Sequence, residues 1–266
     1  MLRAVGKSTL ALASVRQCPP LGGLTLPTMN ARAGDLWNGL PIPATPPTLE
    51  ELAEMLREPP ECWLAFGFLG RRQDEASLAI LVAETASPDQ FRRRSAVAAI
   101  GNHSRGDAAL DAVHRLLADP SPYVVRSAVA AAQQLGDAGS HDAIVGLLSD
   151  ADASTRTTAL HALSVLWQSE DFERVFVVAR NDHAKQVRRE ANWTLREHAD
   201  GANWRRLGEF WITSLLPRER VWACELIKLF GTVADIPHAA ACADDQDGHV
   251  RKAAQDAVST LGSRPR

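Results

Sequence analysis

VRKAAQDAV, residues Val250–Val258, is the last of six copies of a pattern that recurs every 31 or 32 residues along this 266-residue chain. Stepping back from its second alanine, Ala254, reaches an alanine each time, at Ala223, Ala191, Ala159, Ala128 and Ala96. Three residues before five of these six alanines stands an arginine, and four residues after each of them stands an apolar residue. An internal repeat of this length is the signature of a protein built from stacked supersecondary units.

Each repeat has room for two helices, which we name helix A and helix B in chain order. Helix B carries the alanine column, and in the last repeat its apolar residues form one stripe: Val250, Ala253, Ala254, Ala257, Val258 and Leu261. Helix A is expected over 108–117, 141–148, 172–178 and 204–215 in the middle repeats. Because one such helix pair cannot bury its own apolar face, the pairs must stack on one another. The sequence predicts an all-α, right-handed α-solenoid of about six to seven helical hairpins.

A further column lies six residues before the arginine column, where every residue is short and polar: Ser87, Asp119, Asp150, Asp182, Ser214 and Asp245. Together the columns resemble HEAT repeats, in the short form of phycobilisome-lyase-like proteins. The resemblance implies that the loop aspartate and the helix B arginine bridge neighbouring repeats as a ladder. Three repeats match this pattern, with Asp150 and Arg156, Asp182 and Arg188, and Asp245 and Arg251, whereas Asp119 is aligned with Val125 and departs from it.

The solenoid is expected to cover residues 48–262, with six repeats over 75–262 and a degenerate first pair over 48–70. Thr48-Leu-Glu-Glu51 has the form of a capping box, which marks the start of a helix. Residues 1–47 are rich in proline and glycine and are expected to be irregular. Residues 1–16 lack acids and in this resemble a mitochondrial transit peptide, but we expect them to be a poorly ordered bacterial N-terminus or the product of an over-long start site. Residues 263–266 form a tail.

The composition is that of a soluble globular protein, with 45% apolar residues, 23% charged residues and a net charge of −3. No apolar run approaches the roughly 20 residues that a membrane-spanning helix needs. The four cysteines show no Cys-x-x-Cys spacing, which favours a reducing compartment. We therefore expect a cytoplasmic protein with no membrane partner.

The sequence lacks the motifs typical of HEAT-like metal enzymes and of serine hydrolases. The chain has none of the His-Glu dipeptides that hold iron in the HEAT-like deoxyhypusine hydroxylases, and no Gly-x-Ser-x-Gly. His103 and His198 share a repeat position and are expected at helix ends, and Cys224 is expected to be a structural thiol. The acidic loop 244–248 is expected to be an inter-repeat turn with helix capping rather than a calcium loop. We predict no enzyme activity, no cofactor and no metal.

The helix B residues that point away from the apolar stripe give the candidate site, because repeat rods of this kind bind partners along the helix B face. The predicted partner-binding groove consists of Arg94, Arg126, His161, Arg189, Trp193, Arg196, Lys228 and Lys252. Four of the seven tryptophans lie between Trp193 and Trp222, and we expect most of them to fill a thick packing layer. Trp193 is the best candidate for an exposed anchor.

These observations favour a non-catalytic scaffold or adaptor that binds a protein or an acidic peptide in its groove. A nucleic-acid-binding protein similar to the HEAT-like DNA glycosylases is the alternative, since it too would use basic and aromatic side chains. The net charge of −3 speaks against it. A bilin lyase subunit is a second alternative, which the family resemblance alone suggests.

Overall fold

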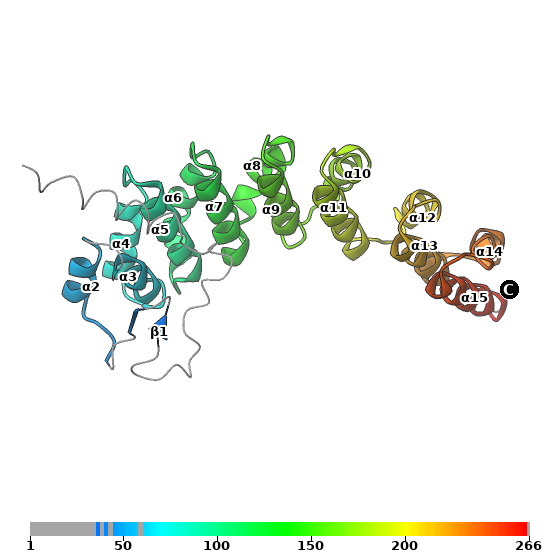
Figure 1. Cartoon of the computed structure of the whole chain (residues 1–266), viewed down its shortest axis with the longest axis horizontal. Helices are drawn as coiled ribbons and strands as arrows, with labels where there is room; N and C mark the ends of the chain where they lie inside the picture. The colour runs from blue at the N-terminus through cyan, green and yellow to red at the C-terminus, as the bar shows by residue number, and fades with distance from the viewer. Residues whose placement is uncertain (1–35, 38–39, 42–44, 58–60, 265–266) are drawn as a thin grey trace, which may run out of the picture. The chain divides into compact units, whose positions relative to one another are not determined.

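The computed structural model describes residues 36–37, 40–41, 45–57 and 61–264, and these residues are mostly helical (Figure 1). They form two compact units that divide between Leu166 and Trp167. Within the described residues, the helices make seven consecutive pairs. The expectations for residues 1–35 lie outside the described part of the chain. Two strands of two residues each, β1 (Leu36–Trp37) and β2 (Leu40–Pro41), pair antiparallel just before the first helix.

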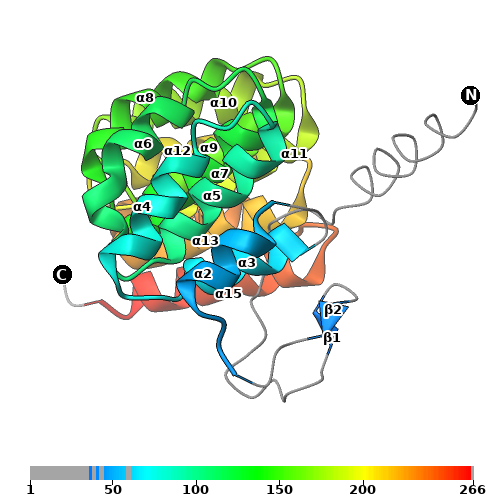
Figure 2. The same ribbon diagram turned by 90° about the vertical axis from the view of Figure 1, so that its left-hand side faces the viewer.

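The first unit is a stack of helix pairs in two layers. Figure 2 shows α4, α6 and α8 in one layer and α5, α7 and α9 in the other, and α5 packs on α7 and α7 on α9. The helices of this unit are α2 (Leu49–Met55), α3 (Glu61–Leu69), α4 (Glu75–Glu84), α5 (Gln90–Asn102), α6 (Leu110–Leu116), α7 (Pro122–Leu135), α8 (His141–Gly146) and α9 (Ala153–Leu163). The expected capping box is confirmed, because Thr48 Oγ1 accepts the Glu51 N–H and Glu51 accepts the Thr48 N–H.

The second unit continues the same alternation of helices. Here α10 packs on α11, α12 on α13, and α13 on α15. Its helices are α10 (Asp171–Asn181), α11 (Lys185–Glu197), α12 (Trp204–Ile212), α13 (Pro217–Phe230), α14 (Ile236–Ala240) and α15 (Gly248–Gly262). None of the helices in the described residues combines the length and the apolar character needed to cross a lipid bilayer.

The helix expected over 204–215 was too long, since α12 ends at Ile212. The reason is the proline that begins α13. A residue before proline is driven out of the helical conformation, and Leu216 is extended, with φ −90° and ψ 116°. The Ser214 hydroxyl oxygen accepts the Leu216 N–H at 3.1 Å and closes a turn ahead of it. Residues 213–216 are therefore a loop between the two helices.

The alanine column is fully buried. All six of its members are 0% exposed: Ala96, Ala128, Ala159, Ala191, Ala223 and Ala254. A larger side chain at these positions would push the packed helices apart, since the separation of two helices depends on the side chains between them. The predicted all-α solenoid of stacked hairpins is confirmed.

The column of short polar residues forms a turn in every repeat. Each of its six side chains accepts a hydrogen bond from the N–H two residues further along the chain, over 2.7–3.3 Å: Ser87, Asp119, Asp150, Asp182, Ser214 and Asp245. Such side-chain turns substitute for a backbone turn, and only Ser, Thr, Asn and Asp make them readily. The turn fixes where each helix B begins.

The arginine column ties the same turn to its own helix. In all five repeats that have the arginine, its Nη1 donates to the carbonyl oxygen of the turn residue, over 2.6–2.9 Å: Arg93, Arg156, Arg188, Arg220 and Arg251. Arg93 also reaches the carboxylate of Asp119 in the next repeat, and Arg220 likewise reaches that of Asp245. The ladder implied by the HEAT resemblance is present at these two positions.

The departure at Val125 does not remove the ion pair of Asp119, because that carboxylate is bridged from the preceding repeat. The neighbouring Arg126 pairs instead with Asp152, at 2.6 Å. Asp152 is also the N-cap of α9. The charged contact between these repeats is therefore shifted by one residue on α7 and by two in the next loop.

His103 lies at the C-terminal end of α5, as expected, and both of its ring nitrogens are used. Nδ1 accepts the Arg105 N–H at 3.1 Å, and Nε2 lies 3.0 Å from Ser77 Oγ. The Ser77 hydroxyl donates to the Asp74 carbonyl oxygen, so Nε2 must carry the proton and donate to Ser77. This neutral tautomer is only 3% exposed. Burial lowers the pKa of His103.

We expect acidification to destabilise the first unit through His103. Because its folded pKa is lowered, the unfolded chain binds a proton first, near the ordinary histidine pKa of about 6.5. Stability should then fall as the pH drops below that value. In urea unfolding at pH 7, 6 and 5, the His103→Gln variant should lose less stability between pH 7 and pH 5 than the parent. Equal losses in the two proteins would contradict the assignment.

Candidate partner-binding site

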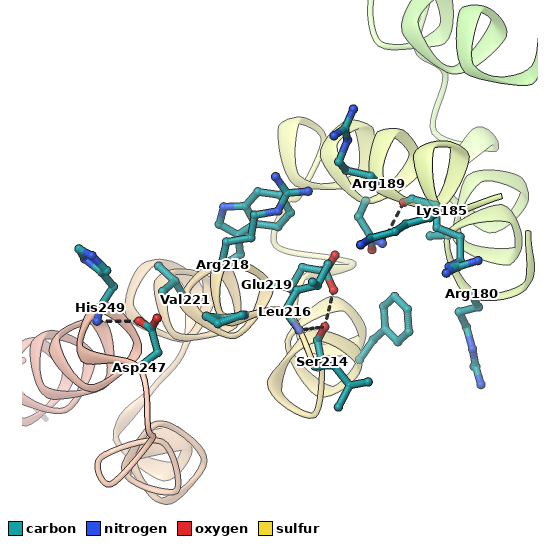
Figure 3. A pocket seen from close by; sticks show the side chains of 17 residues that line it. Arg180, Lys185, Arg189, Ser214, Leu216, Arg218, Glu219, Val221, Asp247 and His249 are labelled. Carbon is teal, nitrogen blue, oxygen red and sulfur yellow. Dashed lines mark hydrogen bonds between the residues drawn. The ribbon is translucent and has the colours of Figure 1, made fainter. Parts of the chain in front are cut away.

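The second unit contains a pocket of about 1200 Å³ that opens between α11 and α13 (Figure 3). The end of α10 and the first half of α11 supply one wall, which includes Arg180, Lys185 and Arg189. The loop after α12 and the first turns of α13 supply the other wall, which includes Leu216 and Arg218. The start of α15 closes one end.

Large aromatic side chains join the two helix pairs that form the pocket. Trp211 of α12 is fully buried, and its Nε1 donates to Asn192 Oδ1 of α11 at 2.7 Å. Phe176 of α10 meets Phe210 of α12 with their ring centroids 5.1 Å apart. Side chains of this size hold two helix pairs further apart than alanine does. The pocket lies in the space that these aromatic side chains leave between the two helix pairs.

Cations outnumber carboxylates around the pocket. Five lining residues carry positive charge, Arg180, Lys185, Arg188, Arg189 and Arg218, against two carboxylates, Glu219 and Asp247. Arg188 is held by the carbonyl oxygen of its turn, as in the other repeats. Within the described residues, the structure records no ion pair for Lys185, Arg189 or Arg218. These three charges are available to a ligand.

The two carboxylates of the pocket are already engaged. Glu219 is 5% exposed and accepts a hydrogen bond from the Ser214 hydroxyl at 2.5 Å. Asp247 caps α15, where its Oδ1 accepts the N–H groups of His249 and Val250. Neither carboxylate neutralises the cations of the opposite wall by a direct ion pair, so the pocket as a whole favours anionic groups.

The second wall is apolar. Leu215 is 94% exposed and Leu216 is 37% exposed, and both line the pocket together with Pro217 and Val221. Their position follows from the turn at Ser214, because this loop holds them outside both helices. A pair of exposed leucines beside a hollow is a common mark of an interaction site.

A cluster of tryptophan and arginine side chains backs the pocket. Trp222 lines the pocket and is 7% exposed, with Trp211 at 5.4 Å and Trp193 at 5.8 Å between ring centroids. The guanidinium groups of Arg196 and Arg218 each lie 5.4 Å from the Trp222 ring centroid. The expected packing layer is therefore present.

Trp193 was expected to be exposed, and it is, with 43% of its surface accessible. Its Nε1 donates to Glu197 at 2.9 Å, within the same helix. Trp193 is not one of the pocket-lining residues. It packs edge-on against Trp222, which is, so its contact with the pocket is indirect.

Three of the eight predicted groove residues lie in the first unit. Arg94 and Arg126 place their guanidinium groups 5.8 and 4.8 Å from the ring centroid of Tyr123, which is 54% exposed. His161 Nδ1 lies 3.3 Å from Gln133 Oε1. The first unit thus gathers Arg94 and Arg126 around one tyrosine.

The other five predicted groove residues lie in the second unit and are placed differently. Arg189 lines the pocket, and Arg196 belongs to the tryptophan cluster with Trp193. Lys228, half-buried on α13, and Lys252, exposed on α15, are not among the residues that line the pocket.

Sequence reasoning missed Arg180, Lys185 and Arg218. Arg180 lies in the last turn of helix A, and Arg218 lies in the first turn of helix B, so neither belongs to the outward helix B columns. The signal that was available is the run Leu215-Leu-Pro-Arg218, in which two large apolar residues precede a helix-starting proline.

The residues considered for metal or catalytic chemistry have structural positions. His198 ends α11 and stacks on Trp167 at 4.2 Å, which confirms the expected helix-end placement. Cys224 is fully buried, and burial raises the pKa of its thiol to about 12, as expected of a structural cysteine. Within the described residues, no group of three or more His, Cys, Asp or Glu side chains is arranged to hold a metal ion.

Comparison of the sequence with known protein families identifies the repeat as a HEAT repeat. A family of HEAT repeats matches residues 78–164 and, overlapping them, residues 110–196. An engineered protein of known structure has a TM-score of 0.52 to this chain at 18% identity, over 80% of this chain and 68% of its own. The search of curated proteins found no match.

Two further solved structures are similar at lower scores. A designed armadillo repeat protein in complex with the peptide (KR)4 has a TM-score of 0.45 at 19% identity, over 81% of this chain and 100% of its own. The complex of CpcE and CpcF of phycocyanin lyase from Nostoc sp. PCC7120 has a TM-score of 0.49 at 16% identity, over 83% of this chain and 98% of its own. With its buried alanine column, its repeated turn and the family match, the part of the chain over 78–196 consists of HEAT repeats.

Proposed function

We propose that this protein is a non-catalytic interaction module that binds an acidic segment of a partner protein in the pocket between α11 and α13. Repeat proteins of stacked helices typically serve as scaffolds for protein interactions. The observation that carries the proposal is the charge of this pocket, with five cations against two carboxylates that already have other partners.

The unpaired cations make binding of carboxylates favourable. Lys185, Arg189 and Arg218 need not give up an ion pair within the described residues when a ligand arrives. Arginine binds carboxylates through two parallel hydrogen bonds, which adds geometric selectivity to the charge attraction. The positive field also attracts acidic partners from a distance and raises the association rate.

The size of the pocket favours a polypeptide segment over a small metabolite. Small-molecule sites are usually enclosed hollows of about 300–1000 Å³. The pocket here is larger, about 1200 Å³, and receives side chains from five helices and the loop between two of them. A short stretch of extended chain would span it.

Reversing the charge of Arg189 should weaken binding of an acidic peptide about tenfold. The test uses a fluorescently labelled peptide of alternating glutamate and phenylalanine, with binding measured by fluorescence anisotropy. The Lys252→Glu variant is the matched control, because Lys252 is also exposed and lies in the same unit but does not line the pocket. Both variants change the net charge equally, so a specific site predicts a loss in Arg189→Glu alone.

Two outcomes would overturn the proposal. Equal losses in the two variants would mean that the peptide responds only to overall charge. Displacement of the peptide by a 20-base-pair DNA duplex at a similar concentration, with a steep dependence on salt, would mean that the pocket serves a nucleic acid instead.

A further inference from the structure

The two walls of the pocket differ in chemistry and belong to different helices. Figure 3 shows Lys185 and Arg189 on α11 on one side and Leu216 beside Ser214 on the other. The first wall offers positive charge, and the second offers exposed leucine side chains. A purely acidic ligand would contact only one of them.

The leucine wall is held in place before any ligand binds. The Ser214 hydroxyl group donates to Glu219 and accepts from the Leu216 N–H, so one side chain closes both ends of the loop. The Leu216 carbonyl oxygen accepts the Glu219 N–H at 3.0 Å. Because the loop is ordered by these bonds, burying Leu215 and Leu216 against a ligand costs little further ordering.

We infer that the ligand is an extended acidic peptide in which a large apolar side chain stands between two carboxylates. This inference rests on the proposed function and adds the sequence pattern that the pocket selects. In an extended chain, successive side chains point to opposite sides. Acidic residues at positions i and i+2 therefore face Lys185 and Arg189, while the apolar residue at i+1 packs on Leu215 and Leu216.

The alternation can be tested with peptides of identical composition. One peptide alternates three glutamates with two phenylalanines, and the second has the same five residues in two blocks. A third replaces both phenylalanines by alanine. We expect the alternating phenylalanine peptide to bind about tenfold more tightly than each of the other two, since burying an aromatic side chain contributes strongly to affinity.

The leucine wall is tested with protein variants. Leu215→Ser should weaken binding of the alternating phenylalanine peptide about tenfold and leave the alanine peptide unchanged. Leu229→Ser is the matched control, because Leu229 is 64% exposed on α13 but does not line the pocket. Circular dichroism verifies that both variants are folded. The comparison of the three peptides uses only the parent protein, so it does not depend on the folding of either variant.

The failures of the two proposals can be told apart. If the phenylalanine and alanine peptides bind equally and Arg189→Glu weakens both, the acidic-ligand site stands and the apolar anchor is wrong. If the blocked peptide binds as tightly as the alternating one, the extended arrangement is wrong. If Arg189→Glu has no effect on any peptide, the proposed function itself fails.

Discussion

Replacing Trp211 with alanine should lower the free energy of unfolding of the second unit by about 3–5 kcal/mol, the usual cost of removing a large buried aromatic side chain. Trp211 is 0% exposed and packs on Trp222 with 5.4 Å between ring centroids. Its loss would also leave Asn192 Oδ1, a buried acceptor, without the indole N–H that it binds at 2.7 Å. An unsatisfied buried polar atom adds its own penalty.

Urea unfolding followed by circular dichroism at 222 nm would measure this loss. Trp193→Ala is the matched control, because it removes the same side chain from the same cluster at a position that is 43% exposed. Its effect should be smaller, about 1 kcal/mol. Similar losses in the two variants would show that burial of Trp211 between the helix pairs does not stabilise the second unit more than an exposed tryptophan does.

Replacing Asp119 with alanine should destabilise the first unit by about 3 kcal/mol. The carboxylate is 3% exposed and accepts two hydrogen bonds from Arg93, at 2.7 and 3.0 Å, as well as the Ser121 N–H. Burial by itself raises the pKa of Asp119, but the hydrogen bonds from Arg93 and Ser121 outweigh it, so the pKa lies below its usual value. Removing the carboxylate leaves the Arg93 charge partly buried without it, and breaking such a pair is costly.

The matched control for Asp119 is Glu54→Ala. Glu54 also pairs with an arginine, Arg57, at 2.8 Å, but both side chains are more than half exposed. Exposed pairs contribute about 0–1 kcal/mol. Chemical denaturation of the two variants should therefore separate them clearly. If Asp119→Ala is as stable as Glu54→Ala, the contact between neighbouring repeats is not a stabilising one.

The repeat was predictable because the same physical demand recurs in each unit. Ala96 and Ala128 lie on helices that pack on each other, and a larger side chain at either position would separate them. The turn residue must be short and must carry a side-chain acceptor, which restricts it to a few residue types. A column that admits so few residues is visible in a single sequence, without any alignment.

The pocket was only partly predictable. Arg189 was identified because it lies in an outward column of helix B, whereas Arg180 and Arg218 lie at helix ends in two different pairs. Their proximity depends on how far apart the pairs stand, which the aromatic layer around Trp211 sets. The sequence indicated that layer but not the volume that it leaves. The end of α12 was misplaced for a local reason, the extended residue before Pro217.

In the five repeats that have it, the column arginine is bonded to a carbonyl oxygen only six residues before it, within the same 31- or 32-residue segment. The turn and the arginine that bonds to it are thus inherited together whenever one segment of the gene is copied. A duplicated segment would carry its own arginine-to-carbonyl bond. It would also offer the neighbouring repeats the same contacts that they already make. An array of this kind can gain or lose members in evolution without the invention of new chemistry at the junction.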